Sequence, residues 1–170
     1  LKALRSQISP HFLYNTLETI NWRAKAMGNE VISQMVESLG NLLRVSLSSQ
    51  KTLVTLAYEL ELVDSYITIQ KIRFEERLEF KVITDEKAKE GMIPPLTIQP
   101  LVENAIVHGT DGAEKICHIQ VSARTEGAYL VLTVADDGCG ITQEELADIR
   151  KEVANYEEDG KKYVALVNIS

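Results

Sequence analysis

The chain has 170 residues, of which 45% are hydrophobic and 25% charged, the composition of a soluble globular protein with one medium domain or two small ones. A formal net charge of -7 argues against a basic surface for nucleic acid, so no nucleic-acid partner is expected. No apolar run approaches the roughly 18 residues that a membrane span needs, and we expect no signal peptide. Because the chain opens at Leu1 already in helical pattern and stops at Ser170, we expect an excised fragment with a membrane segment upstream.

The N-terminal segment predicts two helices joined by a tight turn. Gly28 and Asn29 supply a C-cap and an N-cap in succession. Each helix carries an apolar stripe at helical spacing, and two helices alone cannot enclose a core, so we expect a second copy to complete a four-helix bundle. The stripes are Leu13, Leu17, Ile20, Ala24 and Met27, and then Ile32, Met35, Val36, Leu39, Leu42 and Leu43.

A proline stands directly before a histidine in the first helical segment. Pro10 lacks an N–H, so we expect it to kink the helix beside His11 and to leave room for an incoming group. Asn15, one turn further on, is placed to hold His11 Nδ1 and to leave Nε2 free as a nucleophile. The competing interpretation is a packed, hydrogen-bonded histidine, which is the more common role for a lone histidine on a helix face.

A polar stretch, "SLSSQKT" at 46–52, indicates a linker between two units. Beyond it Thr55 is placed to cap a third helix, whose apolar face is formed by Leu56, Leu60, Val63 and Ile67. The alternating segment "RLEFKVIT" predicts a strand.

The remaining segments predict a mixture of helices and strands. "IPPLTIQPLVENAIVHG" becomes helical after its proline pair and ends at Gly109. "ICHIQVSART" and "AYLVLTVAD" flank Glu126-Gly127 as a strand–turn–strand unit, and "TQEELADIRKEV" is a helix with a capping box. This part of the chain therefore predicts an α+β sandwich.

Two polar stretches are candidates for a ligand site. In "VADDGCGI", Asp136 follows a strand, where its carboxylate could accept a hydrogen bond from the exocyclic amine of adenine, and Gly138 and Gly140 would allow the backbone to approach a ligand. For that stretch taken alone, an ordinary Asp-Gly turn that leads into a helix is the better explanation. In "LVENAIVHG", the Glu103-Asn104 pair would suit a hydrated Mg²⁺, or would cap neighbouring backbone.

Taken together, these stretches resemble the LytS-like and YesM-like sensor histidine kinases. The likeness rests on "QISPHFLYNTL", "LGNLLRVSL", "LAYELELVDSYITIQKIRF", "PPLTIQPLVENAIVHG" and "VADDGCGI". It implies a dimerising helical hairpin over residues 1–52 that carries the phosphoacceptor histidine. It also implies an ATP-binding domain of the GHKL (Bergerat) type over 53–170, an α/β sandwich with a mixed sheet, whose C-terminal part we expect to be truncated.

The resemblance also implies roles for individual residues. His11 is similar to the phosphoacceptor, and Asn104 to the asparagine that holds Mg²⁺. Asp136 is similar to the aspartate that reads adenine, with Gly138 and Gly140 as the glycines after it. Glu103 and His108 lie where the family lines the nucleotide and its phosphates.

The chain departs from the family pattern at two places. Phe12 stands where many histidine kinases have an acidic residue that takes the proton of the histidine, and Glu18 is a candidate for that base. The second glycine box, G-x-G-L-x-N in the family, has Tyr163-Val164-Ala165 where the glycines belong; Lys161 and Lys162 could compensate electrostatically.

The function expected from the resemblance is that of the cytoplasmic core of a membrane-bound, homodimeric sensor kinase. This core would phosphorylate His11 from Mg·ATP and pass the phosphoryl group to a response regulator, with the 46–52 linker as a hinge. Two alternatives remain. One is a degenerate scaffold that binds ATP without transfer, and the other is a GHKL ATPase with Glu103 as its base.

Overall fold

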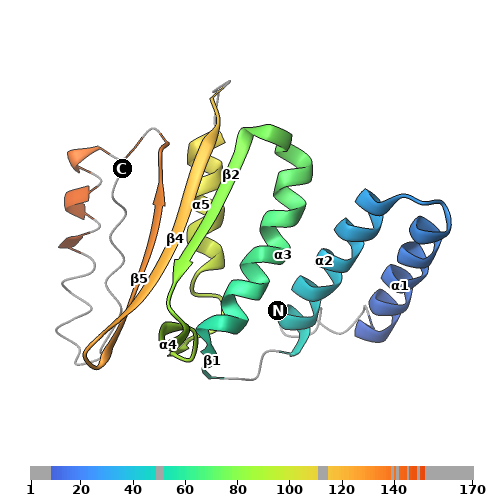
Figure 1. The fold of residues 1–170 in the computed structure, drawn as a ribbon, viewed down its shortest axis with the longest axis horizontal. Helices are drawn as coiled ribbons and strands as arrows, with labels where there is room; N and C mark the ends of the chain where they lie inside the picture. Colours follow the sequence, from blue (N-terminus) through green and yellow to red (C-terminus); the bar gives the residue numbers. More distant parts are fainter. Residues whose placement is uncertain are drawn as a thin grey trace, which may run out of the picture.

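The structure is a computed structural model that describes residues 9–48, 52–110, 115–138, 140, 142–144, 146–148 and 150–151. Helices α1 (Pro10–Ala26) and α2 (Glu30–Ser48) form a hairpin at one end of the molecule. Helix α3 (Leu56–Phe74) lies between this hairpin and a three-stranded sheet, and α5 (Gln99–Thr110) packs beside α3 against the sheet (Figure 1). The fold is α+β, as the sequence predicts.

The turn between α1 and α2 has the predicted caps. Gly28 has a φ of 67°, a conformation that favours glycine, and the Asn29 N–H donates to the Ala24 carbonyl over 2.9 Å. The Asn29 side-chain oxygen accepts the Ile32 N–H at 3.1 Å and so begins α2.

The prediction of a helix kink at Pro10 is wrong. Helix α1 begins at Pro10, after Ser9 in an extended conformation with φ -63° and ψ 125°. Proline suits the first helical position because the N–H that it lacks would have no helical partner there. Pro10 therefore begins the helix that carries His11 and does not bend it.

Helix α2 also continues further than the sequence indicated, through Ser48, so residues 46–48 of the expected linker are helical. Towards its C-terminal end α2 packs against α3, where Asn41 Nδ2 donates to Ser65 Oγ over 3.5 Å. Thr55 caps α3 as predicted, and its hydroxyl accepts the Tyr58 N–H at 3.3 Å.

The sheet is mixed. Its order is β2 (Leu78–Thr84), β4 (Cys117–Glu126), β5 (Tyr129–Asp136); β4 is parallel to β2 and antiparallel to β5. Four short elements were not predicted. They are β1 (Val54–Thr55) paired with β3 (Met92–Ile93), the 3-10 turn η1 (Glu75–Arg77) and α4 (Glu86–Lys89).

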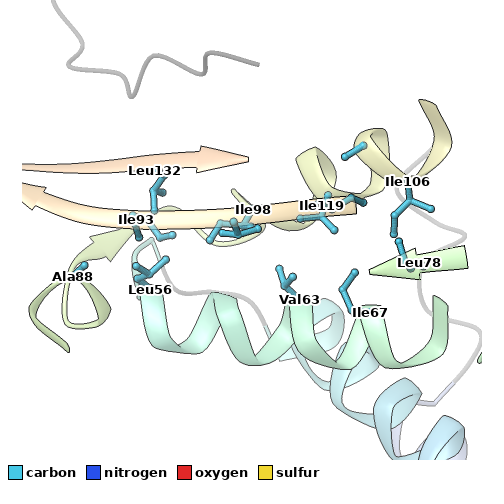
Figure 2. Packing of buried hydrophobic residues seen from close by; sticks show 14 of the residues in the cluster. Leu56, Val63, Ile67, Leu78, Ala88, Ile93, Ile98, Ile106, Ile119 and Leu132 are labelled. Atoms are coloured by element: carbon cyan, nitrogen blue, oxygen red, sulfur yellow. The ribbon is translucent and has the colours of Figure 1, made fainter. Parts of the chain in front are cut away.

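The core lies between the sheet and the two helices that cover it. Figure 2 shows Val63 and Ile67 of α3 facing Ile119 of β4, and Leu56 near Ile93 of β3. Burial of such aliphatic side chains is the main favourable term that holds α3 and α5 on the sheet. The buried residues of α3 include the predicted Leu56, Val63 and Ile67, whereas Leu60 is only partly buried.

The structure describes only part of the C-terminal segment for which predictions were made. The Leu146 N–H donates to the Thr142 carbonyl over 2.9 Å, and the described residues at 143–151 are helical, but Glu145 of the capping box lies outside the described residues. Cys139 and the second glycine box at 161–168 also lie outside them. Among the helices that are described, none is long and apolar enough to cross a membrane.

Candidate functional site

The loop after β5 lies against the C-terminal end of α5. A Cβ atom on Gly138 would come within 3.2 Å of the Gly109 Cα and 3.3 Å of the His108 carbonyl oxygen. It would also come within 2.8 Å of Asp136 Oδ1, so a side chain at residue 138 would require these neighbours to shift. The strand end that carries Asp136 and the helix that carries Asn104 therefore meet at one place.

Asp136 is on the helix-covered face of the sheet. It pairs directly opposite the buried Ile119 of β4, and residues paired in this way share a face. Asp136 itself is half-buried, and its Oδ1 accepts the Gly138 N–H at 3.0 Å. Its second carboxylate oxygen has no hydrogen bond among those of the described residues, so it is available to a ligand donor.

Asp137, the next residue, belongs to the opposite face. The His118 N–H donates to its Oδ1 and His118 Nδ1 lies against its Oδ2, both at 2.8 Å. Lys115 Nζ is 3.4 Å from the same Oδ2, and His118 Nε2 is 3.5 Å from Glu79 Oε2. The His118 backbone N–H above all, helped by the His118 ring and Lys115, lowers the pKa of Asp137 from 3.8 to about 2.

Helix α5 presents its polar residues on two different flanks. Asn104 and His108 are exposed and one turn apart, so they share a flank. Glu103 lies about 100° around the helix from Asn104. Its Oε1 accepts a hydrogen bond from Gln99 Nε2 at 2.8 Å. The pKa of Tyr66 on α3 is raised mainly by burial and, as the second cause, by the charge of Glu103. The structure therefore does not bring Glu103 together with Asn104 and His108.

The C-terminal end of α5 is fixed on the sheet through Gly109. A Cβ atom there would overlap the Cys117 sulfur of β4. Burial is the main cause that raises the pKa of the Cys117 thiol, and the carboxylates of Asp137 and Asp136 raise it further. Cys117 is thus a buried, protonated packing residue.

The N-terminal end of α5 is held by a residue that the sequence analysis did not single out. Glu59 of α3 is only 1% exposed, and its carboxylate accepts the N–H groups of Leu96, Thr97 and Ile98 at 2.7, 2.8 and 3.1 Å. The sequence signal that could have identified Glu59 is its position three residues after Leu56, inside the apolar face of α3, where an acidic residue needs partners.

His11 is separate from this arrangement. It is exposed near the start of α1, which packs on α2, and Figure 1 shows α1 on the far side of α2 from α3. Asn15 Nδ2 lies 3.3 Å from His11 Nδ1 and 3.4 Å from Nε2. The expected contact is therefore present, but it does not distinguish the two ring nitrogens or leave Nε2 free.

The residues at the junction of α5 and β5 fit a nucleotide with Mg²⁺. A carboxylate with one uncommitted oxygen on the inner face suits an amine donor, and the side-chain oxygen of Asn104 is the hard ligand that Mg²⁺ takes together with phosphate oxygens. In the described part of the chain no three His, Cys, Asp or Glu side chains form a metal cluster, and a metal held mainly by phosphate needs none.

Two family models match the chain. The model described as "Histidine kinase" matches residues 1–78, and that described as "Histidine kinase-, DNA gyrase B-, and HSP90-like ATPase" matches residues 96–163. A solved histidine kinase domain, from a blue-light activated histidine kinase of Erythrobacter litoralis, is 18% identical with a TM-score of 0.44, over 79% of this chain and 74% of that one.

Curated relatives are more similar in sequence. The sensor histidine kinase YesM of Bacillus subtilis is 50% identical over 141 residues, 83% of this chain and 24% of the relative. The sensor histidine kinase BtsS of Escherichia coli is 38% identical over 143 residues, 84% of this chain and 25% of the relative. The chain thus spans about a quarter of the length of these relatives.

Proposed function

Because this chain belongs to the sensor histidine kinases of the LytS and YesM type, we propose that it transfers the γ-phosphoryl group of ATP to His11. In this proposal residues 1–52 are the dimerisation and phosphotransfer hairpin, and residues 53–170 are the ATP-binding domain. The observation that carries it is the close approach of Gly138 to His108 and Gly109, which supports a single site for Asp136 and Asn104.

In the nucleotide site Asp136 accepts the adenine amine through the carboxylate oxygen that Gly138 leaves uncommitted. Gly138 and Gly140 keep the loop close to the ligand, and Gly140 has a φ of 72°, which glycine tolerates. Asn104 would hold Mg²⁺, and His108, on the same flank, would line the site of the phosphates. The bound metal supplies charge neutralisation on the phosphate oxygens during transfer.

At the acceptor, a neutral His11 ring nitrogen attacks in line. One N–P bond forms, the bond between the γ-phosphorus and the bridging oxygen breaks, ADP leaves and the other ring nitrogen loses its proton. Asn15 orients the ring, and Glu18, two turns further along α1 and in the lining of the α1–α2 groove, is the candidate for the base that takes the proton. Because α1 and α5 lie apart, transfer requires either a movement of the hairpin or a site from the partner copy.

The hairpin surface supports a homodimer. Ile20, Ile32 and Leu39 from the predicted stripes remain 41%, 43% and 41% exposed in the single chain. A groove of about 760 Å³ lies between α1 and α2, and its lining includes Leu17 and Val36 as well as the charged Glu18 and Arg44. We further propose a response regulator as phosphoryl acceptor, and a cytoplasmic position in a longer membrane-bound sensor.

Neither alternative has a specific observation in its favour. The ATPase alternative used Glu103 as the base, but Glu103 is engaged with Gln99 and lies near Tyr66, on the other flank of α5 from Asn104. The scaffold alternative rested on residues 163–165, which lie outside the described residues.

Incubation with γ-labelled ATP tests the proposal. We expect acid-labile label on the wild-type chain and none on His11→Gln. Bound nucleotide without label would instead support the scaffold, and free phosphate without protein label would support the ATPase. Stable label on His11→Gln would contradict the assignment of His11.

A further inference from the structure

A buried carboxylate joins α3 to the start of α5. Glu59 is 1% exposed and is the acceptor for three successive backbone N–H groups, those of Leu96, Thr97 and Ile98. Oε1 accepts one of them, and Oε2 accepts the other two. A carboxylate at a helix N-terminus also interacts favourably with the helix dipole, so Glu59 acts as a cap for α5 that comes from another helix.

The segment that Glu59 holds is constrained in further ways. Leu96 has a φ of 59°, which is rare for a non-glycine residue, and Thr97 Oγ1 donates to the Pro94 carbonyl over 2.6 Å. The Ile98 carbonyl accepts the N–H groups of Leu101 and Val102 and so starts the helix. The three hydrogen bonds to Glu59 therefore set where α5 begins and how it is rotated.

The rotation of α5 decides which way Asn104 faces. Asn104 lies about one and two-thirds turns after Ile98, and a helix is stiff over that distance. On the sheet side, Gly109 fixes the other end of α5 against Cys117. From this geometry we infer that Glu59 is a positioning residue for the nucleotide site, one that orients Asn104 toward the metal without touching nucleotide or metal. The inference rests on the function proposed above.

The change Glu59→Gln tests this assignment with little change in size. The glutamine amide places N–H donors where one carboxylate oxygen accepted, so at least one buried backbone N–H loses its acceptor. Asp136 on β5 is independent of this contact. The affinity for ADP without metal should therefore change little, whereas the gain in affinity that Mg²⁺ brings should fall roughly tenfold.

Two control variants separate positioning from loss of charge and of stability. Glu61→Gln makes the same substitution on an exposed residue of the same helix. Leu132→Ala removes buried volume from β5, at a residue that is 5% exposed, and lowers the stability of the fold without removing an acceptor from the start of α5. Titrations of the 170-residue chain with ADP, with and without Mg²⁺, are made well below the lowest unfolding temperature. Glu59→Asp, which keeps the charge but shortens the reach, replaces Glu59→Gln if the latter does not fold.

We expect the Mg²⁺-dependent gain to fall in the Glu59 variant and to persist in both controls. An equal loss in Leu132→Ala, or no loss in the Glu59 variant, would overturn the inference while leaving the proposed function intact. A wild-type chain that binds no ADP, or whose binding Mg²⁺ does not affect, would contradict the proposed function and the inference with it. The backbone amide proton shifts of residues 96–98 provide a second readout. They should move upfield in Glu59→Gln only, and unchanged shifts would contradict the assignment.

Discussion

At the scale of single residues, adjacent side chains have different roles because they lie on different faces. Asp136 shares a face with the buried Ile119, whereas Asp137 is tied to the His118 backbone and ring on the other face. The sequence predicted a strand that ends near Asp136, and β5 does end there. It could not reveal the partners of Asp137, because His118 is 19 residues away and meets it only through the strand register.

The depressed pKa of Asp137 predicts a pH dependence of stability. Its folded-state pKa of about 2 is below the ordinary 3.8, so the ionised carboxylate stabilises the folded chain above about pH 4. That contribution is lost as the pH falls through 2. Urea unfolding of wild type and Asp137→Asn should therefore show a difference at pH 5 that shrinks towards pH 2. A difference that does not change over this range would contradict the account.

Asn15 gives a second prediction at this scale. Its amide lies within 3.4 Å of both ring nitrogens of His11, so its removal should leave the ring free to rotate. Asn15→Ala should therefore lower the initial rate of His11 labelling severalfold with little change in nucleotide affinity. Thr16→Ala is the matched control, since Thr16 is exposed and its hydroxyl donates to the Phe12 carbonyl. Equal rates in wild type and Asn15→Ala would show that Asn15 has no part in the transfer.

At the scale of elements, the seating of α5 on β4 depends on a glycine. A Cβ atom at Gly109 would overlap the Cys117 sulfur, so Gly109→Ala should lower the free energy of unfolding by about 1–3 kcal/mol. Removal of that sulfur makes room, so Gly109→Ala combined with Cys117→Ala should cost less than the sum of the two single changes. Chemical denaturation of wild type, the two single variants and the double variant measures the three free-energy changes. Strict additivity of the two single changes would argue against the contact between residue 109 and the Cys117 sulfur.

The main helices and strands were predictable because their signals are local. Gly28-Asn29, Thr55 and the alternating pattern at 78–84 each specify a cap or a strand from neighbouring residues. The β1–β3 pair and the Glu59 cap were not predictable, since each joins residues that are 37 or more positions apart. Pro10 was misjudged because a proline inside a periodic pattern fits either a kink or a helix start.

At the scale of the whole molecule, the apolar hairpin predicts association. Leu39 is 41% exposed on α2, and we expect the chain to form a dimer with twice its mass of 19.0 kDa. Leu39→Glu places a charge in that interface and should give a monomer by light scattering after gel filtration. Ile83→Glu, at a residue 45% exposed on β2, is the control that should remain dimeric. A wild-type monomer at micromolar concentration would contradict the four-helix bundle.

The central claim is that the strand end at Asp136 and the flank of α5 at Asn104 form one nucleotide site. The most direct test compares ADP binding by calorimetry in Asp136→Asn and Asp137→Asn, the same change at adjacent residues on opposite faces of the sheet. We predict that Asp136→Asn abolishes measurable binding and that Asp137→Asn retains it. Wild-type affinity in Asp136→Asn would contradict the account.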